Sequence, residues 1–270
     1  MRGYTNKASE KEITMEKIIK YPRTPHIKGS RLQAGDEDLS QIPFEKIKGK
    51  HVVVEEKVDG ANVAVSFTAE GELLLQSRGR FLTGGYREKH YNLFKIWAAQ
   101  RLEELYLILE DRYVMYGEWL HPKHRLYYDA LPDYFLEFDI LDKKTMQFLD
   151  TGARRAMLEG SSIFSVPVLA EGVFRSEKDI LNYLGKSNYQ TDSFLDALRE
   201  EALKVGVDPE EAISETDTTP LMEGLYLKIE EGGFCVDRMK YVRYGYSQIQ
   251  KQEDGRWLAK PIIANRLKEK

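Results

Sequence analysis

Three short apolar segments between residues 51 and 77 constrain the fold of this chain more than any other feature. They read HVVVEEKV, NVAVSFT and ELLLQS, and the turns DGA and AEGE separate them. Apolar runs of this length, bounded by Gly and Asp, are typical of neighbouring antiparallel strands. The same pattern predicts later strands at 111–120, 134–142, 223–231 and 233–245, the last two joined by a tight acidic-Gly turn.

Helical patterns occupy two other parts of the chain. Residues 87–110 carry apolar side chains near a 3.6-residue period, which predicts a helix. From about 151 to 215, four segments have an N-cap residue or a proline near their start and a helical composition. We therefore expect an α+β fold of mainly antiparallel sheets, in which residues 17–270 form one domain with a helical insertion at about 176–219. The polar lead, 1–16, is expected to be disordered, and the C-terminal tail, 246–270, is too short for a second domain.

Composition narrows the class of protein. No apolar run approaches the ~20 residues that a membrane-spanning helix needs, and the N-terminus lacks a signal-peptide core. The single Cys235 excludes a disulfide framework and a cysteine-based zinc site within one chain, and it favours a reducing, cytoplasmic setting. The net charge of −4 counts against a protein that tracks long nucleic acid, although basic segments at 17–31, 86–95 and 121–125 are candidates for phosphate contact.

The segment EEKVDGAN, 55–62, places Lys57 at the end of the first predicted strand. Read alone, the segment is a β-turn with Asp-Gly at its corner, and the lysine is a solvated turn residue. The alternative is a nucleophile, and polar residues that punctuate the other strands favour it. These residues lie in SRGR (77–80), YGEWL (116–120), FLEFDI (135–140), EGLYLK (223–228) and DRMKYVR (237–243).

Strand periodicity brings these polar residues into two groups. Side chains two apart on a strand share a face, so Lys57 and Asp59 point one way together, as do Arg238 and Lys240. Lys228 has opposite parity to the acid that opens its segment, so we do not place it in the pocket. The pattern predicts one pocket lined by an anionic and a cationic set, as a magnesium nucleotide requires.

The six segments, in this order from about residue 50 to 243, resemble the signature of the covalent nucleotidyltransferases, which are ATP-dependent polynucleotide ligases and mRNA capping enzymes. The resemblance is strongest to RNA ligases of the RNA ligase 2 type. It implies the nucleotidyltransferase (ATP-grasp-like ligase adenylation) fold without an OB domain, and ATP with Mg²⁺ or Mn²⁺ as cofactors. It also implies Lys57 as the nucleophile, Asp59 and Glu223 as metal-assisting acids, and a nucleotide-binding set of Glu56, Asn62, Arg78, Glu118, Phe138, Arg238 and Lys240.

The chemistry of a lysine nucleophile rests on its pKa. A free ε-amine titrates near about 10.4, so almost none is unprotonated at neutral pH. Burial beside Arg238 and Lys240 is expected to lower the pKa of Lys57 and free the amine to attack the α-phosphorus of ATP. The resemblance implies that the resulting lysyl–AMP passes AMP to a 5′-phosphate end, which a 3′-hydroxyl then attacks.

Other residues have plainer interpretations that stay open. Phe138 is either the aromatic that stacks on adenine or a core residue, and the Tyr-rich segments 125–135 and 241–246 are more often core than base platforms. His121 and His124 read as a loop rather than a zinc site. Residues 80–86 have the glycines of a flexible loop without a P-loop lysine.

Three functions compete. The first is an ATP-dependent RNA ligase acting on RNA ends in RNA repair, as a monomer, with an end-healing kinase–phosphatase as a candidate partner. The second is a minimal DNA ligase, a capping enzyme or another polynucleotide adenylyltransferase. The third is a non-catalytic nucleic-acid-binding module, against which the intact Lys57 argues. The residues alone leave open RNA or DNA ends, and nick or single-strand joining.

Overall fold

The computed structural model describes residues 17–32, 35–36, 38–246 and 260–269. The expected disordered lead, 1–16, and residues 247–259 of the expected tail lie outside the described residues. Within the described part, no helix is long and apolar enough to cross a membrane.

The described strands form one 13-stranded sheet, which is antiparallel except for three short pairings that involve β1, β2 and β10. Its main path runs β11-β3-β12-β13-β9-β8-β7-β4-β5-β6. The strands are β1 His26–Ile27, β2 Gln41–Ile42, β3 His51–Lys57, β4 Ala61–Phe67, β5 Leu73–Ser77, β6 Arg80–Phe81, β7 Tyr113–Trp119, β8 Phe135–Asp142, β9 Gln147–Leu149, β10 Phe164–Ser165, β11 Val168–Val173, β12 Gly224–Glu231 and β13 Phe234–Val242.

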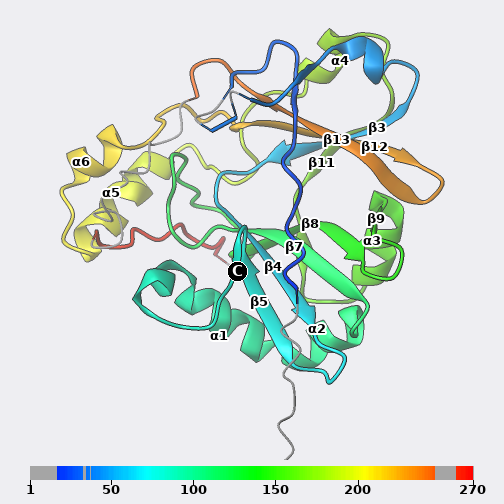
Figure 1. Cartoon of the computed structure of the whole chain (residues 1–270). Coiled ribbons are helices and arrows are strands. Elements are labelled where there is room, and N and C mark those ends of the chain that lie inside the picture. Colours follow the sequence, from blue (N-terminus) through cyan, green and yellow to red (C-terminus); the bar gives the residue numbers. More distant parts are fainter. Residues whose placement is uncertain (1–16, 33–34, 37, 247–259, 270) are drawn as a thin grey trace, which may run out of the picture.

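The sheet bends into two groups of strands, as Figure 1 shows. One group holds β3, β11, β12 and β13, and the other holds β4, β5, β7 and β8. Residues 58–60 carry the chain directly from β3 in one group to β4 in the other. The end of β3 therefore lies where the two groups meet.

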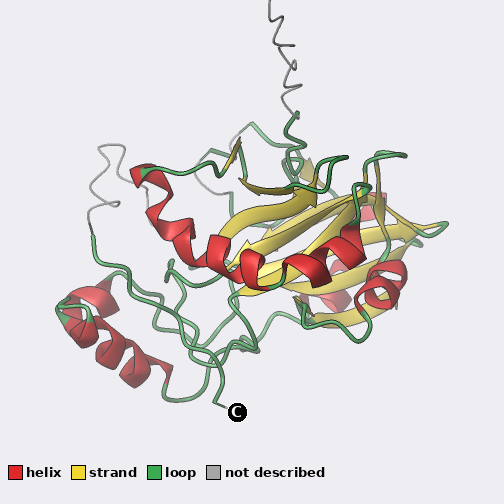
Figure 2. Ribbon diagram, turned by 90° about the horizontal axis from the view of Figure 1, so that it is seen from below, coloured by secondary structure: helices red, strands yellow, loops and turns green. Residues whose placement is uncertain are grey.

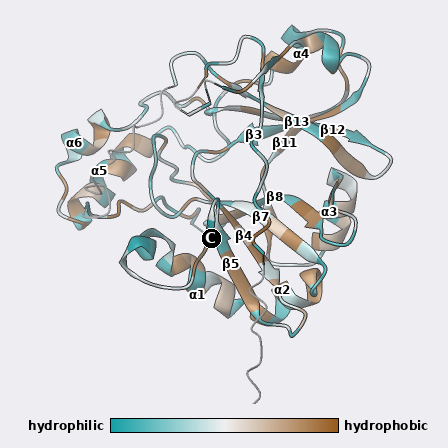
Figure 3. Ribbon diagram, viewed as in Figure 1, coloured by the Kyte–Doolittle hydropathy of each residue, from teal (hydrophilic) through white to brown (hydrophobic). Residues whose placement is uncertain are grey.

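Six helices surround these strands in the described part: α1 Asn92–Gln100, α2 Leu102–Leu109, α3 Thr151–Leu158, α4 Glu177–Leu181, α5 Phe194–Lys204 and α6 Pro209–Ser214. Residues of α1, α2 and α3 share one hydrophobic cluster with β4, β7 and β8. The view in Figure 2 shows helices lying along the strands, while the α5–α6 pair stands to one side. Hydrophobic residues gather in the strands and the helix faces that cover them (Figure 3).

The helix predicted at 87–110 is interrupted. A 3-10 turn spans Tyr86–Tyr91, and α1 and α2 meet at Arg101, whose backbone (φ −113°, ψ 18°) is not helical. The Arg101 guanidinium donates to the Asp133 carboxylate at 2.9 Å and stacks on the Trp97 ring. These tertiary contacts accompany a break that the apolar period does not reveal.

Strand β11 lies inside the stretch predicted to be helical, 151–215. It pairs antiparallel with β3, with Val173 opposite His51 and Val168 opposite Glu55. Its sequence, VLAEGV, is short and only half-buried, so it has no strong period of its own. Pairing with the buried β3 therefore decides its conformation, which local propensity does not predict.

Candidate active site

A cavity of about 1010 Å³ opens where the two groups of strands meet. Its lining includes most of the residues assigned to the site from the sequence: Glu56, Lys57, Asp59, Asn62, Arg78, Glu118, Phe138, Glu223 and Lys240. These residues come from β3, β4, β7, β8 and β13, from the segments that follow β3 and β5, and from the segment that precedes β12. The structure thus brings together side chains that the sequence separates by up to 184 positions, from Glu56 to Lys240.

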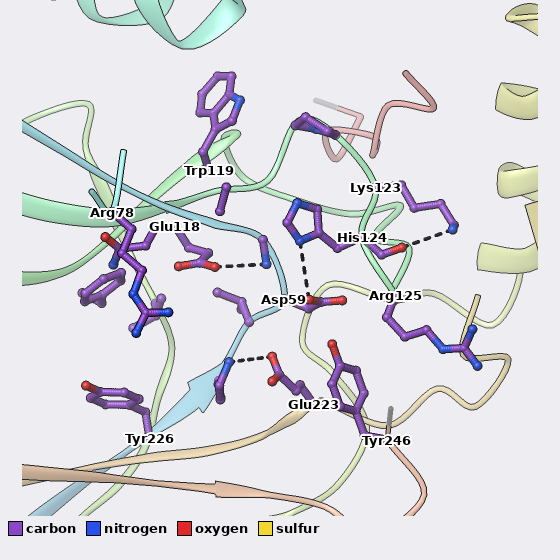
Figure 4. Close-up of a pocket in the computed structure, with 18 of the residues that line it drawn as sticks. Asp59, Arg78, Glu118, Trp119, Lys123, His124, Arg125, Glu223, Tyr226 and Tyr246 are labelled. Carbon is purple, nitrogen blue, oxygen red and sulfur yellow. Dashed lines mark hydrogen bonds and ion pairs between the residues drawn. The ribbon is translucent and has the colours of Figure 1, made fainter. Parts of the chain in front are cut away.

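Lys57 is the last residue of β3, and its Cα pairs with that of Gly224 at the start of β12. This register sets Lys57 beside Glu223. The lysine Nζ donates to Glu223 Oε2 at 2.7 Å (Figure 4). The Glu223 side chain is fully buried, whereas that of Lys57 is 20% exposed to the cavity. A charge-assisted hydrogen bond of this length is among the strong ones in a protein.

Two more carboxylates face the same ammonium. Glu118, on β7, accepts a hydrogen bond from the Gly60 N–H at 3.1 Å. Asp59 accepts one from the Leu126 N–H at 2.7 Å and lies 3.8 Å from the His124 ring. Gly60 leaves room for this turn, because a Cβ there would lie 2.7 Å from the Trp119 carbonyl oxygen.

The carboxylates carry shifted pKa values. Burial raises the pKa of Glu118 to about 8; the Lys57 charge opposes this, and Glu223 and Asp59 add to it. Burial likewise raises the pKa of Glu223 to about 7, again against the pull of Lys57. Negative charge therefore exceeds positive charge around Lys57, and protons or cations are favoured there.

The expectation that the pKa of Lys57 is lowered is wrong for this structure. Burial does lower it, but the charges of Glu223, Glu118 and Asp59 outweigh burial and raise the pKa above its ordinary value. The cations of β13 have less influence on Lys57 than expected, because Glu223 is in direct contact with it and Glu118 and Asp59 add to the negative charge.

The two cations of β13 occupy different environments. Lys240 lines the cavity, and its Nζ binds the Asp36 carboxylate. Arg238 is 9% exposed and is absent from the described lining of the cavity. Its guanidinium lies over the Phe148 ring at 3.9 Å, with Nε 3.5 Å from Asp139. Strand periodicity puts both residues on one face, but Phe148 and Asp139 cover the Arg238 end of that face.

The remaining nucleotide-binding candidates line the cavity at different depths. Arg78 follows β5 and is exposed, and Asn62 lies opposite Glu118 in the β4–β7 register. Phe138 is half-buried and packs edge-on against Tyr21, with ring centroids 5.1 Å apart. Phe138 thus both faces the cavity and packs against other apolar side chains, so neither interpretation from the sequence excludes the other.

Glu56 is held by a segment from the helical stretch. Its carboxylate accepts hydrogen bonds from the Ser187 hydroxyl at 2.6 Å and from the Asn188 side chain at 2.7 Å. Burial raises the pKa of Glu56, and these bonds partly offset the shift. The three hydrogen bonds from Ser187 and Asn188 fix this carboxylate at the cavity wall.

A buried ion network beneath the cavity was not predicted from the sequence. Lys228 Nζ lies 2.9 Å from Glu55 and 3.2 Å from Asp139, and Arg154 of α3 contacts Glu55 and Glu137 at 2.8 Å each. Lys228 and Arg154 both donate to the carbonyl oxygen of Phe138. Lys228 is fully buried and outside the described lining, although it lies on the same face of β12 as Tyr226, which lines the cavity. Its contacts with Glu55 and Asp139, rather than its parity, keep it out of the cavity. The acids that flank Phe138 in FLEFDI are the sequence signal for this network.

The N-terminal segment also reaches the site, which the sequence did not indicate. Tyr21 lines the cavity and donates to Asp139, and its hydroxyl lies 2.8 Å from that of Tyr226. This segment runs between the two groups of strands in Figure 1.

The site offers carboxylates rather than a complete metal cage. Within the described residues, no group of three or more His, Cys, Asp or Glu side chains has the arrangement of a metal site. Glu223 Oε1 is buried and has no hydrogen-bond partner among the residues described. A divalent cation that also binds phosphate oxygens and water needs only one or two protein carboxylates, and Glu223 can supply one of them.

The fold and site define a class. Antiparallel strands in two groups, with a lysine at the strand end facing buried carboxylates in the cavity between them, form a ligase-type nucleotidyltransferase core. The RNA ligase family model matches residues 50–242, and the chain belongs to this family.

Solved structures that are similar to this chain include three RNA ligase structures. An archaeal ATP-dependent RNA ligase has a TM-score of 0.50 and 17% identity, over 83% of this chain and 48% of its own. Two Naegleria gruberi RNA ligase mutants with ATP and Mn have TM-scores of 0.47 and 0.44 and identities of 16% and 15%. They cover 75% and 74% of this chain, and 52% and 51% of theirs. This chain therefore spans about half the length of the structures it matches. No curated protein matches it.

Proposed function

We propose that this protein is an ATP-dependent RNA ligase that joins 5′-phosphate and 3′-hydroxyl ends through a lysyl–AMP intermediate on Lys57. The observation that carries the proposal is the 2.7 Å contact between Lys57 and the buried Glu223, inside a cavity that Arg78, Phe138 and Lys240 also line. Membership of the RNA ligase family supports the reaction class.

The first step requires an unprotonated Lys57. Glu223 is the carboxylate in contact with the ammonium, so a cation bound to Glu223 would lower the pKa of Lys57 and let its proton pass to water. The Nζ lone pair then forms a bond to the α-phosphorus of ATP, and the bond to the pyrophosphate oxygen breaks. Lys240 is placed to leave Asp36 and bind the departing phosphates.

Residues that line the cavity would contact the nucleotide and the metal. Phe138 would stack on adenine, and Asn62, Arg78, Glu118 and Glu56 would contact the nucleoside and phosphates. Neighbouring structures of Naegleria gruberi RNA ligase contain ATP and Mn. Glu223 and Asp59 would hold Mg²⁺ or Mn²⁺, and the excess of carboxylates around Lys57 supports this assignment. When bound, the cation supplies charge that offsets the negative phosphoryl oxygens.

The biological setting follows from the chemistry of the ends. A 5′-phosphate and a 3′-hydroxyl are the products of an end-healing kinase–phosphatase, so a reaction of that class would supply the substrate. We infer a role in RNA repair, as a monomer, in the cytoplasm. The free thiol of Cys235 fits a reducing compartment.

The proposal is tested by sealing of matched nicked duplexes. The duplexes differ only in whether the nucleotides on the 3′-hydroxyl side are ribose or deoxyribose, because the 2′-hydroxyl distinguishes RNA from DNA. We expect faster sealing of the ribose nick with ATP, and no sealing with GTP. Equal or faster sealing of the all-DNA nick would replace the RNA assignment with a minimal DNA ligase.

A further inference from the structure

The cavity continues beyond the Lys57 site. Past Asp59 and His124 it is lined by Lys123, Arg125 and the C-terminal residues Lys260 to Ile263. In Figure 4, Lys123 and Arg125 extend away from Asp59, and the His124 ring lies next to Asp59 on the Lys123 side. We call the part of the cavity around Lys123, Arg125 and Lys260 the side lobe.

Hydrogen bonds hold the backbone segments that form the side lobe together. The Lys123 N–H donates to the Ile263 carbonyl at 2.8 Å, and the Asn265 N–H donates to the His121 carbonyl at 2.9 Å. The Asn265 side chain is 1% exposed and bridges the Tyr128 N–H and the Leu120 carbonyl. The C-terminal segment is thus clamped along the loop between β7 and β8, so the cations of this loop have fixed positions.

Two of the three cations of the side lobe, Lys123 and Arg125, have no acidic partner in the described chain. Lys123 Nζ donates to the carbonyl oxygens of His124 and Glu215 at 3.1 and 3.2 Å. Neither Lys123 nor Arg125 forms an ion pair with a carboxylate in the described chain. Arg125 Nε is buried and, among the residues described, has no hydrogen-bond partner. A buried donor without a partner is disfavoured, so an anionic acceptor in the lobe would stabilise it.

The nearest carboxylate of the lobe is already engaged. Glu215 Oε1 binds Lys260 at 2.6 Å, which leaves Lys123 and Arg125 without a compensating charge. Burial lowers the pKa of Lys123 to about 8, with Glu215 and Asp59 opposing the shift and Arg125 and Lys260 adding to it. A bound phosphate would favour the charged lysine.

We propose that the side lobe binds an internucleotide phosphate of an RNA strand whose end reacts at Lys57. This inference rests on the proposed function. In Figure 4, Arg78 lies on the opposite side of Asp59 from Lys123 and Arg125, and Lys240 binds Asp36, so the cations available to the triphosphate of ATP are distinct from those of the lobe. A polynucleotide extends beyond its reacting end, and Pro261 and Ile263 give its sugars an apolar wall. Such a local pair of cations also suits a chain whose net charge is −4.

The test separates the three steps of ligation. The test variants are Lys123→Met and Arg125→Gln. Lys123→Arg is a control that keeps the positive charge, and Lys204→Gln is a control at an exposed lysine. The assays measure AMP labelling of the protein by ATP, AMP transfer from labelled protein to a 5′-phosphorylated RNA strand, and sealing of a pre-adenylylated strand to a 3′-hydroxyl strand. Retained labelling by ATP also shows that each variant is folded.

We expect labelling within about twofold of wild type and a loss of about tenfold or more in transfer or in sealing, since a hydrogen bond to a charged group is lost in each variant. Loss of transfer places the 5′-phosphate strand in the lobe, and loss of sealing alone places the 3′-hydroxyl strand there. The magnitude of the slope of log affinity for single-stranded RNA against log salt should decrease by about 0.7 per lost contact, and Lys123→Arg should keep the wild-type slope.

Two results would overturn the inference. One is weaker labelling with a raised ATP requirement, which would assign the lobe to nucleotide phosphates. The other is no change in any step. Failure of the wild-type protein to label with ATP, with RNA affinity still dependent on Lys123 and Arg125, would reject the proposed function and leave the phosphate site standing.

Discussion

Lys57 shares its surroundings with more negative charge than it can balance. Glu223, Glu118 and Asp59 all raise its pKa, while burial raises the pKa of the first two acids to about 7 and 8. Such a site holds the lysine as an ammonium until cations take over the carboxylates. Under the proposed function, activation of Lys57 would therefore follow the arrival of a metal nucleotide, rather than depend on the cations of β13.

The Glu118 carboxyl leads to a prediction about stability and pH. Its folded-state pKa of about 8 lies above the ordinary value of 4.5, so the folded protein binds the extra proton and loses stability as pH rises through this window. Glu118→Gln remains neutral and keeps an acceptor for the Gly60 N–H. We expect the variant to melt higher than wild type at pH 9, by about 2–4 °C per kcal/mol gained, and the difference to vanish near pH 4. A pH-independent difference would contradict the assigned cause.

Phe138 gives a second prediction at this scale, because it is half-buried and faces the cavity. Phe138→Ala should weaken ATP binding by about 1–3 kcal/mol and slow the chemical step less. Its loss of stability should stay below the about 3–5 kcal/mol expected for a fully buried phenylalanine such as Phe94. ATP titrations and melting curves of Phe138→Ala and Phe94→Ala measure both. If the two variants lose the same stability and Phe138→Ala keeps the wild-type affinity for ATP, Phe138 is a core residue only.

At the scale of elements, helix α3 joins the two groups of strands through one side chain. Arg154 is 2% exposed and contacts Glu55 of β3, Glu137 of β8 and the Phe138 carbonyl. Arg154→Met leaves two buried carboxylates without this partner, and we expect a loss of about 3–5 kcal/mol in urea unfolding. The neighbouring Arg155 has a 56% exposed side chain and a 3.7 Å contact to Glu171, so Arg155→Met should change stability by less than about 1 kcal/mol. Equal losses of unfolding free energy in the two variants would mean that the buried ion network does not stabilise the protein more than a surface contact does.

The elements also show what a sequence can predict here. Strands β3, β4, β7, β8, β12 and β13 follow the apolar pattern within a few residues, because burial on the sheet imposes that pattern. The sequence did not predict strand β11 or the break at Arg101, since their conformations depend on partners distant in the chain.

Among site residues, the order of the six motifs correctly predicted that Lys57, Glu118 and Glu223 share one cavity. The position of Arg238 outside the described cavity lining was not predicted, because Phe148 and Asp139, which cover it, come from other strands.

At the scale of the whole molecule, distant parts of the described chain meet around one cavity. Tyr21 near the N-terminus closes one side, and Lys260 to Ile263 near the C-terminus closes another. The RNA ligase family match ends at residue 242, so the C-terminal wall lies outside it. The side lobe therefore combines Lys123 and Arg125, which lie within the family match, with a C-terminal wall that lies outside it.

The central claim is that Lys57 carries AMP. The most direct measurement is peptide mass spectrometry of the protein after incubation with ATP and Mg²⁺ or Mn²⁺, which locates the modified residue. We predict AMP on Lys57, and complete loss of the adduct in Lys57→Ala, with a cooperative melting curve that shows the variant still folds. AMP on another residue, such as Lys123 with its lowered pKa, or an adduct that persists in Lys57→Ala, would contradict the account.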